Sequence, residues 1–180
     1  MKQLSILLLS LFISSFGYSQ NLFKASAGEI SFFSSTPVED IDATNKLVKA
    51  LINTDNNEIV FITTIIGFKF KKPLMEEHFN ENYMESDKYK VATFKGKIIT
   101  PIDYSIDGKY KVQAKGILNI HGVDQDREIP GELVIKDDHI ELTSNFDVKL
   151  ADHDIKRPKL VIKNIAETVA VKVNVNFERK

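Results

Sequence analysis

The chain has 180 residues, no cysteine and a formal net charge of −1. Without cysteine there are no disulfides, no thiolate metal sites and no cysteine nucleophile. Basic and acidic residues are interspersed and form no basic stripe, so nucleic acid is not an expected partner.

Residues 1–19 have the layout of a secretory signal peptide. Lys2 precedes an apolar run from Leu4 to Ile13, and small residues stand at Gly17 and Ser19. This pattern predicts cleavage between Ser19 and Gln20 and export to the periplasm or the medium. No later stretch approaches the ~20 apolar residues that a membrane-crossing helix needs. We therefore expect a signal peptide at 1–19, one exported domain at 20–180, and no integral membrane segment.

The beginning of the exported domain is expected to be extended. In Phe23 to Ser34, Ile30 and Phe32 share one face. The apolar spacing of Thr44 to Ile52 fits either a helix or a strand. We prefer the strand, because the turn residues Asn53 to Asn57 lead directly into another apolar run, which is typical of a hairpin.

The run from Glu58 to Phe70 is predicted to be one strand that is apolar on both faces. One parity holds Ile59, Phe61 and Ile65, and the other includes Val60 and Phe68. Both faces would then need cover from water. One can belong to the core, and the other requires a second layer or an enclosed apolar cavity that holds a guest molecule.

A short amphipathic helix is predicted from Pro73 to Asn82. Pro73 suits a first helical position, and Glu76 and Glu77 in the first turn complement the helix dipole. The apolar face includes Met75 and Phe79. We expect this helix to act as a lid over the ends of strands.

The rest of the chain alternates polar and apolar residues as strands do. Turn residues are expected at Gly122 to Asp126 and at Asp137–Asp138, and an irregular segment is expected from Ala151 to Pro158. The predicted strands are Val91 to Ile99, Lys109 to His121, Glu128 to Lys136, His139 to Leu150 and Thr168 to Glu178.

About eight strands in antiparallel succession predict an all-β domain, either a sandwich or a barrel. An eight-stranded barrel has room for one small ligand, whereas an aligned sandwich has no lumen. The two-sided apolar run favours the eight-stranded antiparallel barrel with a short helical lid segment.

Three segments resemble the YceI-like domain family. Leu74 to Ile98 contains Met75, the pair His78–Phe79 and a Lys-Tyr-x-x-Ala-Thr-Phe strand that begins at Lys88. Gly28 to Phe32 resembles the opening strand of that family, and Gly116 to Val123 resembles a strand that ends in a Gly-Val turn. The resemblance extends over about Ala25 to Phe177.

The resemblance implies an exported, lipocalin-like barrel that holds a long apolar molecule: a polyisoprenoid, an isoprenoid quinone or a fatty amide. It also implies binding or transport without catalysis. Twelve phenylalanines and no tryptophan suit an apolar lumen. We expect the lumen and its lid to be lined by Ile30, Phe32, Phe61, Ile65, Phe68, Phe70, Met75, Phe79, Phe94, Val112, Leu118, Phe146 and Val173.

No residue pattern indicates a metal site, a cofactor or a reaction. The histidines are far apart in sequence and form no His-x-x-x-His pair, and no acidic cluster has the spacing of a calcium loop. There is neither a Gly-x-Ser-x-Gly elbow nor a phosphate-binding loop. His78 is expected at the junction of helix and barrel, and His121 and His139 at exposed strand ends.

The sequence thus favours an exported carrier or store for a long-chain lipid, with no catalysis. One alternative is an enzyme or stress-related factor acting on such a lipid, with His78 or His153 at the barrel mouth as its acid or base. Another is an interaction module that needs no ligand. Whether two chains form a homodimer stays open.

Overall fold

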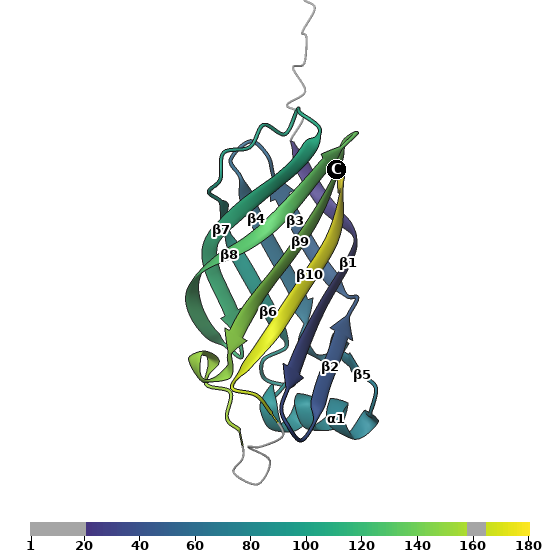
Figure 1. Ribbon diagram of the computed structural model, residues 1–180, viewed down its shortest axis with the longest axis vertical. Coiled ribbons are helices and arrows are strands. Elements are labelled where there is room, and N and C mark those ends of the chain that lie inside the picture. Colours follow the sequence, from purple (N-terminus) through teal and green to yellow (C-terminus); the bar gives the residue numbers. More distant parts are fainter. Residues whose placement is uncertain (1–20, 158–164) are drawn as a thin grey trace, which may run out of the picture.

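The computed structural model describes residues 21–157 and 165–180, which are mostly antiparallel strands (Figure 1). The predicted signal peptide lies outside the described residues, as does Pro158 at the end of the predicted irregular segment. The strands are β1 (Leu22–Ser35), β2 (Asp40–Asn45), β3 (Val48–Asn53), β4 (Glu58–Thr64), β5 (Lys69–Phe70), β6 (Val91–Ile98), β7 (Gly108–Ile120), β8 (Val123–Lys136), β9 (His139–Lys149) and β10 (Thr168–Arg179).

Eight of these strands close into a barrel, which confirms the predicted fold. Their order around the ring is β1, β10, β9, β8, β7, β6, β4 and β3, and β3 pairs again with β1. Every pairing in the ring is antiparallel. Closure pairs the strand edges that an open sheet would expose.

The long strand β1 changes its pairing partner along its length, and this leaves the barrel open at one end. Its first residues, Leu22 to Lys24, pair with β3, whereas Ile30 to Ser35 pair with β2 instead. The strand β2 then pairs with the short β5 through Ala43 and Phe70. Because β1 moves away from β3, the ring is complete at one end and widens at the other, where β2 and β5 extend the wall.

The prediction of one strand from Glu58 to Phe70 is wrong beyond Thr64. A 3-10 turn at Ile65–Gly67 separates β4 from β5. The cause is the fully buried Asn45, whose Nδ2 donates to the Thr64 carbonyl at 2.7 Å and whose Oδ1 accepts from Leu47 N at 2.7 Å. A Cβ on Gly67 would lie 2.6 Å from Asn45 Nδ2, so only glycine lets the turn approach this side chain.

This turn changes which residues face the interior. Ile66, which an unbroken strand would have placed on the same face as Phe68, is 63% exposed. Phe68 is buried and Phe70 is half-buried. The second apolar face is therefore not one continuous surface, and its phenylalanines turn inward at the wide end of the barrel.

The predicted turn from Gly122 to Asp126 is also wrong, because β8 already begins at Val123. The chain reverses within His121 and Gly122, both of which have positive φ, 54° and 76°. A two-residue hairpin turn of this kind matches the twist of its strands. Asp124 and Asp126 are exposed strand residues, and Asp124 accepts a hydrogen bond from Asn119 across the hairpin at 2.6 Å.

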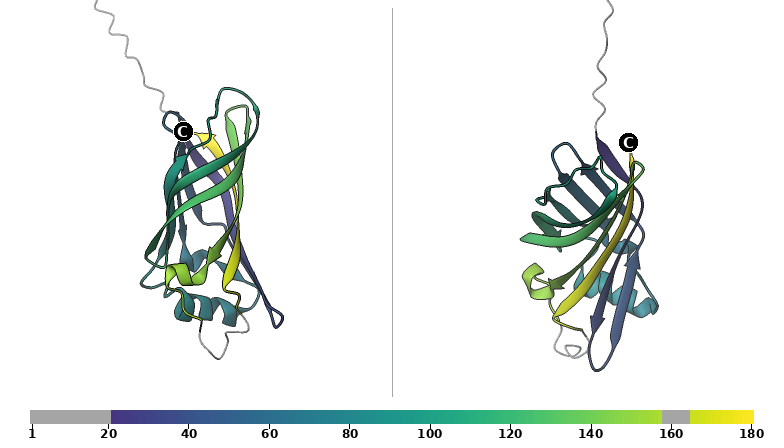
Figure 2. Two further views of the ribbon diagram at one scale, coloured as in Figure 1. Left: turned by 60° about the vertical axis from the view of Figure 1, so that its left-hand side comes forward. Right: turned by 45° about the horizontal axis from the view of Figure 1, so that its top comes forward.

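The prediction of a single strand from Thr44 to Ile52 is wrong, because β2 ends at Asn45 and β3 begins at Val48. The hairpin of β3 and β4 is confirmed. The helix α1 (Pro73–His78) begins at Pro73 and continues as a π-helical turn, Phe79–Tyr83. Two further views show α1 across the wide end of the barrel (Figure 2). The 3-10 turn Leu150–His153 lies at the same end, and the C-terminus lies at the opposite end.

The narrow end of the barrel is a solid core, which we call the closed end. Its side chains are at most 4% exposed and are not part of the wall of the large barrel cavity described below. Arg179 covers this core from outside, with its guanidinium 4.8 Å from the centre of the Phe23 ring. The closed end comprises Phe23, Ile52, Leu133, Ile140, Val175 and Phe177.

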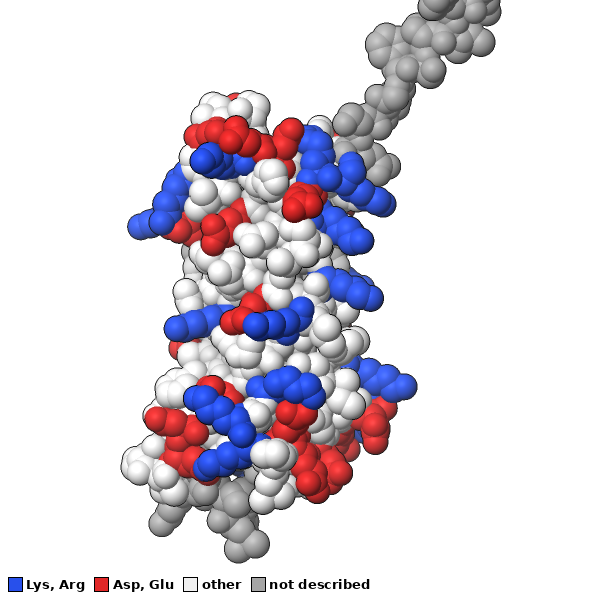
Figure 3. Space-filling model, turned by 90° about the vertical axis from the view of Figure 1, so that its right-hand side faces the viewer, with Lys and Arg blue, Asp and Glu red and all other residues white. Residues whose placement is uncertain are grey.

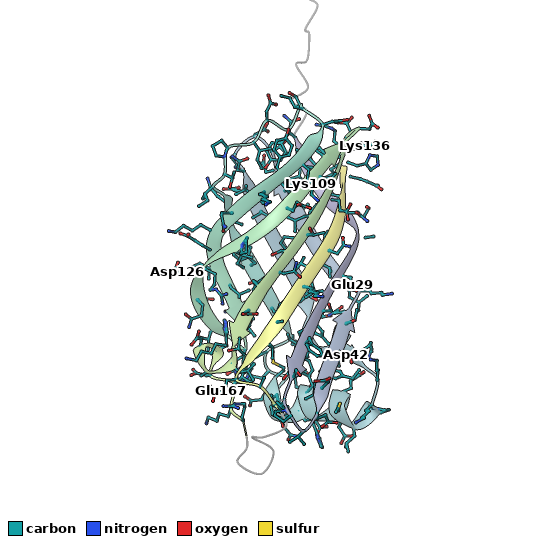
Figure 4. The ribbon with its side chains drawn as sticks, viewed as in Figure 1. Glu29, Asp42, Lys109, Asp126, Lys136 and Glu167 are labelled. Carbon is teal, nitrogen blue, oxygen red and sulfur yellow. The ribbon has the colours of Figure 1, made fainter. Side chains whose placement is uncertain are left out.

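The outer surface carries charges of both signs. On the face in Figure 3, lysine and arginine side chains lie among aspartate and glutamate side chains. None of the helices in the described part of the chain has the length and apolar character needed to cross a bilayer. The labelled side chains in Figure 4 point away from the barrel interior: Glu29, Asp42, Lys109, Asp126, Lys136 and Glu167.

Candidate ligand-binding site

A cavity of about 560 Å³ occupies the wide part of the barrel and ends at the closed end. Its wall is almost entirely apolar, because the inward-facing parity of each strand carries aliphatic and aromatic residues. The edge-to-face pair Phe61 and Phe177, with ring centres 6.2 Å apart, marks the boundary between the cavity and the closed end. The geometry is that of a tube blocked at one end.

All thirteen residues that the sequence predicts for the lumen and its lid lie in the wall of this cavity. Ile30 and Phe32 come from β1, Phe61 from β4, and Val173 from β10. Strand alternation brings the strand residues together, because every second side chain of a barrel strand points inward. The turn before β5 and the lid instead supply Ile65, Phe68, Met75 and Phe79. Their role in binding a ligand stays a prediction.

Four phenylalanines form a cluster near the open end, which we call the aromatic collar. Phe79 stacks on Phe32 with ring centres 5.5 Å apart, and it contacts Phe70 at 5.0 Å and Phe68 at 5.7 Å. These rings come from β1, from the segment around β5 and from the π-helical turn after α1. The collar thus attaches the lid to the barrel through the packing of aromatic side chains.

The mouth of the cavity lies between the start of β2 and α1. Lys72 and Glu39 face each other there, with Lys72 Nζ 2.8 Å from Glu39 Oε1. Leu74 lines the cavity and is also 60% exposed, so the apolar wall continues onto the outer surface. His78 lines the mouth from the end of α1, as the sequence predicts.

The start of α1 is attached to β5 by Glu76. This carboxylate accepts hydrogen bonds from Lys69 Nζ at 2.5 Å and from Phe70 N at 3.3 Å. The hydrogen bond from Lys69 is the main cause that lowers the pKa of Glu76, and the Phe70 N–H adds to it. The ion pair is solvent-exposed, so it orients the lid more than it stabilises the fold.

Two histidine predictions are wrong. His121 is not an exposed strand-end residue but is 8% exposed, and His153 is fully buried and absent from the cavity wall. His121 Nδ1 lies 3.1 Å from the His153 carbonyl oxygen, and its Nε2 lies 3.0 Å from Glu85 Oε2. These contacts join the turns that contain Glu85, His121 and His153 at the wide end. Because His153 is buried outside the cavity wall, it is not an acid or base at the mouth. His139 is exposed, as expected.

The buried His153 predicts a loss of stability in acid. Burial is the main cause that lowers its pKa, so the native state keeps this imidazole neutral, whereas the unfolded chain takes up a proton near pH 6.5. The free energy of unfolding should therefore be retained above about pH 6.5 and fall below it, by at most about 1.4 kcal/mol per pH unit from this residue. Urea denaturation between pH 8 and pH 5 measures the slope.

The matched variants for this prediction are His153→Gln and His139→Gln. The first should flatten the acid slope, because glutamine does not titrate. The second makes the same exchange at an exposed histidine and is the control for the exchange itself. Equal slopes in wild type and His153→Gln would contradict the prediction.

Several wall residues were not predicted from the sequence. Tyr83 and Met84 lie just beyond the predicted end of the helix, and Ile129 and Leu142 come from two of the predicted strands, Glu128 to Lys136 and His139 to Leu150. The same alternation that selected Phe146 could have identified Leu142. In contrast, no local signal places Tyr83 in the wall, because this depends on the π-helical turn that continues α1.

The family model of the YceI-like domain matches residues 14–177. The chain belongs to the YceI-like domain family. This agrees with the resemblance in the sequence and accounts for nearly the whole barrel. A search of curated protein sequences finds no significant match.

Solved structures with the same fold have low sequence identity to this YceI-like chain. A polyisoprenoid-binding domain from Saccharophagus degradans, implicated in plant cell wall breakdown, is 17% identical with a TM-score of 0.74 over 89% of this chain and 99% of that one. BcnA of Burkholderia cenocepacia is 13% identical, with a TM-score of 0.70 over 83% and 95%. The YCEI protein of Campylobacter jejuni is 15% identical, with a TM-score of 0.57 over 100% of both chains.

Among the described residues, no three histidine, aspartate or glutamate side chains gather in a way that could hold a metal ion. The chemistry that this site offers is therefore that of its wall. The wall is apolar apart from a few hydroxyl groups and one ion pair, Lys72 with Glu39.

Proposed function

We propose that the protein binds a long-chain lipid in the barrel cavity and carries or stores it, without changing it chemically. The observation that carries this proposal is the apolar, one-ended cavity of about 560 Å³. Ligand pockets typically measure about 300–1,000 Å³. The likeness in fold to a polyisoprenoid-binding domain supports the same class of ligand.

The depth of the cavity suits a lipid tail. Leu142 and Val148 on β9 both line it and are six residues apart, which is about 20 Å along a strand. A typical strand tilt of about 40° reduces this to about 15 Å along the barrel axis. One leaflet of a bilayer has a hydrocarbon thickness of about 15 Å, half of the ~30 Å core.

The burial of the tail supplies enough free energy for tight binding. Each buried methylene contributes about 0.8 kcal/mol, so about ten of them contribute roughly 8 kcal/mol before the entropic cost of association. A charged anchor is not required at this magnitude. The wide end, with its collar and short lid, supplies the entrance.

We further propose that the protein acts outside the cytoplasm, with residues 1–19 removed as a signal peptide. This part of the proposal rests on the charged start, the apolar run and the small residues before Gln20. Sequencing the N-terminus of the protein isolated from its own cells tests it. A mature N-terminus at Gln20 supports the proposal, and an N-terminus that retains the apolar run contradicts it.

The lipid proposal is tested by native mass spectrometry of the protein purified from the cells that naturally produce it. We expect a mass above that of the polypeptide, which disappears after organic extraction and returns when the extracted protein is incubated with the extract. A protein that purifies without lipid, and that takes up none from the extract, would contradict the proposal.

A further inference from the structure

Among the described residues, one buried hydroxyl group in the cavity wall has no hydrogen-bond partner. Thr63, near the end of β4, lines the cavity, is 6% exposed, and its Oγ1 is buried without a partner. The buried serines in the same wall are satisfied: Ser34 Oγ accepts from Ala166 N at 3.0 Å, and Ser144 Oγ donates to the Pro130 carbonyl at 2.6 Å. Buried hydroxyls are rarely left without a partner, so Thr63 needs an explanation.

Thr63 is placed where the polar end of a lipid would lie. The cavity is blocked at the closed end, so a tail must enter first and leave its polar end toward the mouth. The strand β4 runs from the closed end toward the wide end and finishes at Thr64, one residue after Thr63. A rotation about χ1 exchanges the hydroxyl and methyl groups of a threonine, so the hydroxyl can turn toward a guest.

The charges at the mouth restrict the chemistry of that polar end. Apart from His78, the acidic and basic side chains that line the cavity within the described residues are Glu39 and Lys72, which neutralise each other at 2.8 Å. A phosphate or diphosphate would have to compete with the Glu39 carboxylate for Lys72 and would remain close to that negative charge. A neutral oxygen has no such cost.

We propose that the ligand is a neutral long-chain lipid with a hydroxyl or carbonyl oxygen, and that Thr63 hydrogen-bonds to this oxygen. The inference rests on the proposed function, because it names the class of lipid and the residue that recognises it. Thr63 acts as a specificity-determining group, while the apolar wall supplies most of the affinity.

The test compares Thr63→Val with Thr64→Val. Valine has nearly the shape of threonine but lacks the hydroxyl. Thr64 is the matched control, because its Oγ1 is also buried without a partner but does not line the cavity. Kd is measured by native mass spectrometry for three probes: geranylgeraniol, geranylgeranyl diphosphate and the hydrocarbon squalene.

We expect wild type to bind geranylgeraniol more tightly than its diphosphate. Thr63→Val should weaken the binding of geranylgeraniol by about threefold to tenfold, the value of a typical net hydrogen bond, and leave squalene binding unchanged. Thr64→Val should leave both unchanged. Glu39→Gln should strengthen diphosphate binding, because it releases Lys72 from its ion pair.

The inference is overturned if Thr63→Val affects geranylgeraniol no more than Thr64→Val does. It is also overturned if wild type binds the diphosphate at least as tightly as the alcohol, or if Glu39→Gln brings no gain for the diphosphate. In these cases lipid binding itself survives and only the recognition of the polar end is wrong. If none of the three probes binds, both the inference and the proposed function fail.

Discussion

Replacing Ala114 by phenylalanine is expected to shorten the cavity and weaken the binding of long chains about fifty-fold. Ala114 on β7 lines the cavity, and it pairs with Ile98 on β6 and with Ile129 on β8. Four residues earlier on β7, Tyr110 pairs with Leu133, which belongs to the closed end. The added ring would displace about three methylenes of the tail, a loss of about 2.4 kcal/mol. Kd for primary alcohols of increasing chain length measures the effect.

Chain length distinguishes this effect from general damage to the fold. Alcohols too short to reach Ala114 should bind the variant as they bind wild type, whereas longer ones should no longer gain affinity with each added methylene. The control is Ala170→Phe, which adds the same ring on the exposed face of β10. If Ala114→Phe binds the longest alcohols as tightly as Ala170→Phe does, the blind tube is not the binding site.

Replacing Gly116 by alanine is expected to destabilise the barrel by about 3 kcal/mol. Gly116 on β7 lies directly opposite Gly96 on β6. A Cβ at Gly116 would lie 2.3 Å from the Lys95 carbonyl oxygen and 2.4 Å from Gly96 Cα, both in the backbone. Overpacking typically costs about 1–3 kcal/mol, and the upper end applies because backbone atoms cannot rotate away. Urea denaturation measures the free energy of unfolding.

The matched control is Gly108→Ala, at the start of the same strand. A Cβ at Gly108 would lie 3.3 Å or more from its nearest neighbours, which belong to the Tyr110 side chain. We expect its free energy of unfolding to stay within about 0.5 kcal/mol of wild type. The prediction is contradicted if Gly116→Ala lowers the free energy of unfolding by no more than Gly108→Ala does. In that case β6 and β7 would have moved apart to admit the methyl group without a loss of stability.

The barrel and its lumen could be predicted because they depend on periodicity. Side chains alternate across a strand, so the inward set of β7 or β10 is visible in the order of residues alone. Phe94, Val112 and Val173 were assigned to the lumen in this way, and they lie in the cavity wall. The helix α1 was predicted from Pro73 and the acidic first turn, which are also local features.

The errors have a common cause, which is contact between residues far apart in sequence. Asn45 ends β4 through a hydrogen bond to Thr64, 19 residues away, and no feature of the run from Glu58 to Phe70 predicts that bond. His121 and His153 are buried because separate turns meet at the wide end. Their local sequences, with acidic and glycine neighbours, look like exposed turns.

By itself, the sequence determined that this chain forms a β-wall with one apolar side, because alternation is a property of neighbouring residues. Only the tertiary structure decided that the interior is solid at one end and hollow at the other. That difference depends on where β1 leaves β3 for β2, which sets the width of the ring at each level. The same inward-facing residue types pack against one another where the ring is narrow and cannot reach across it where it is wide.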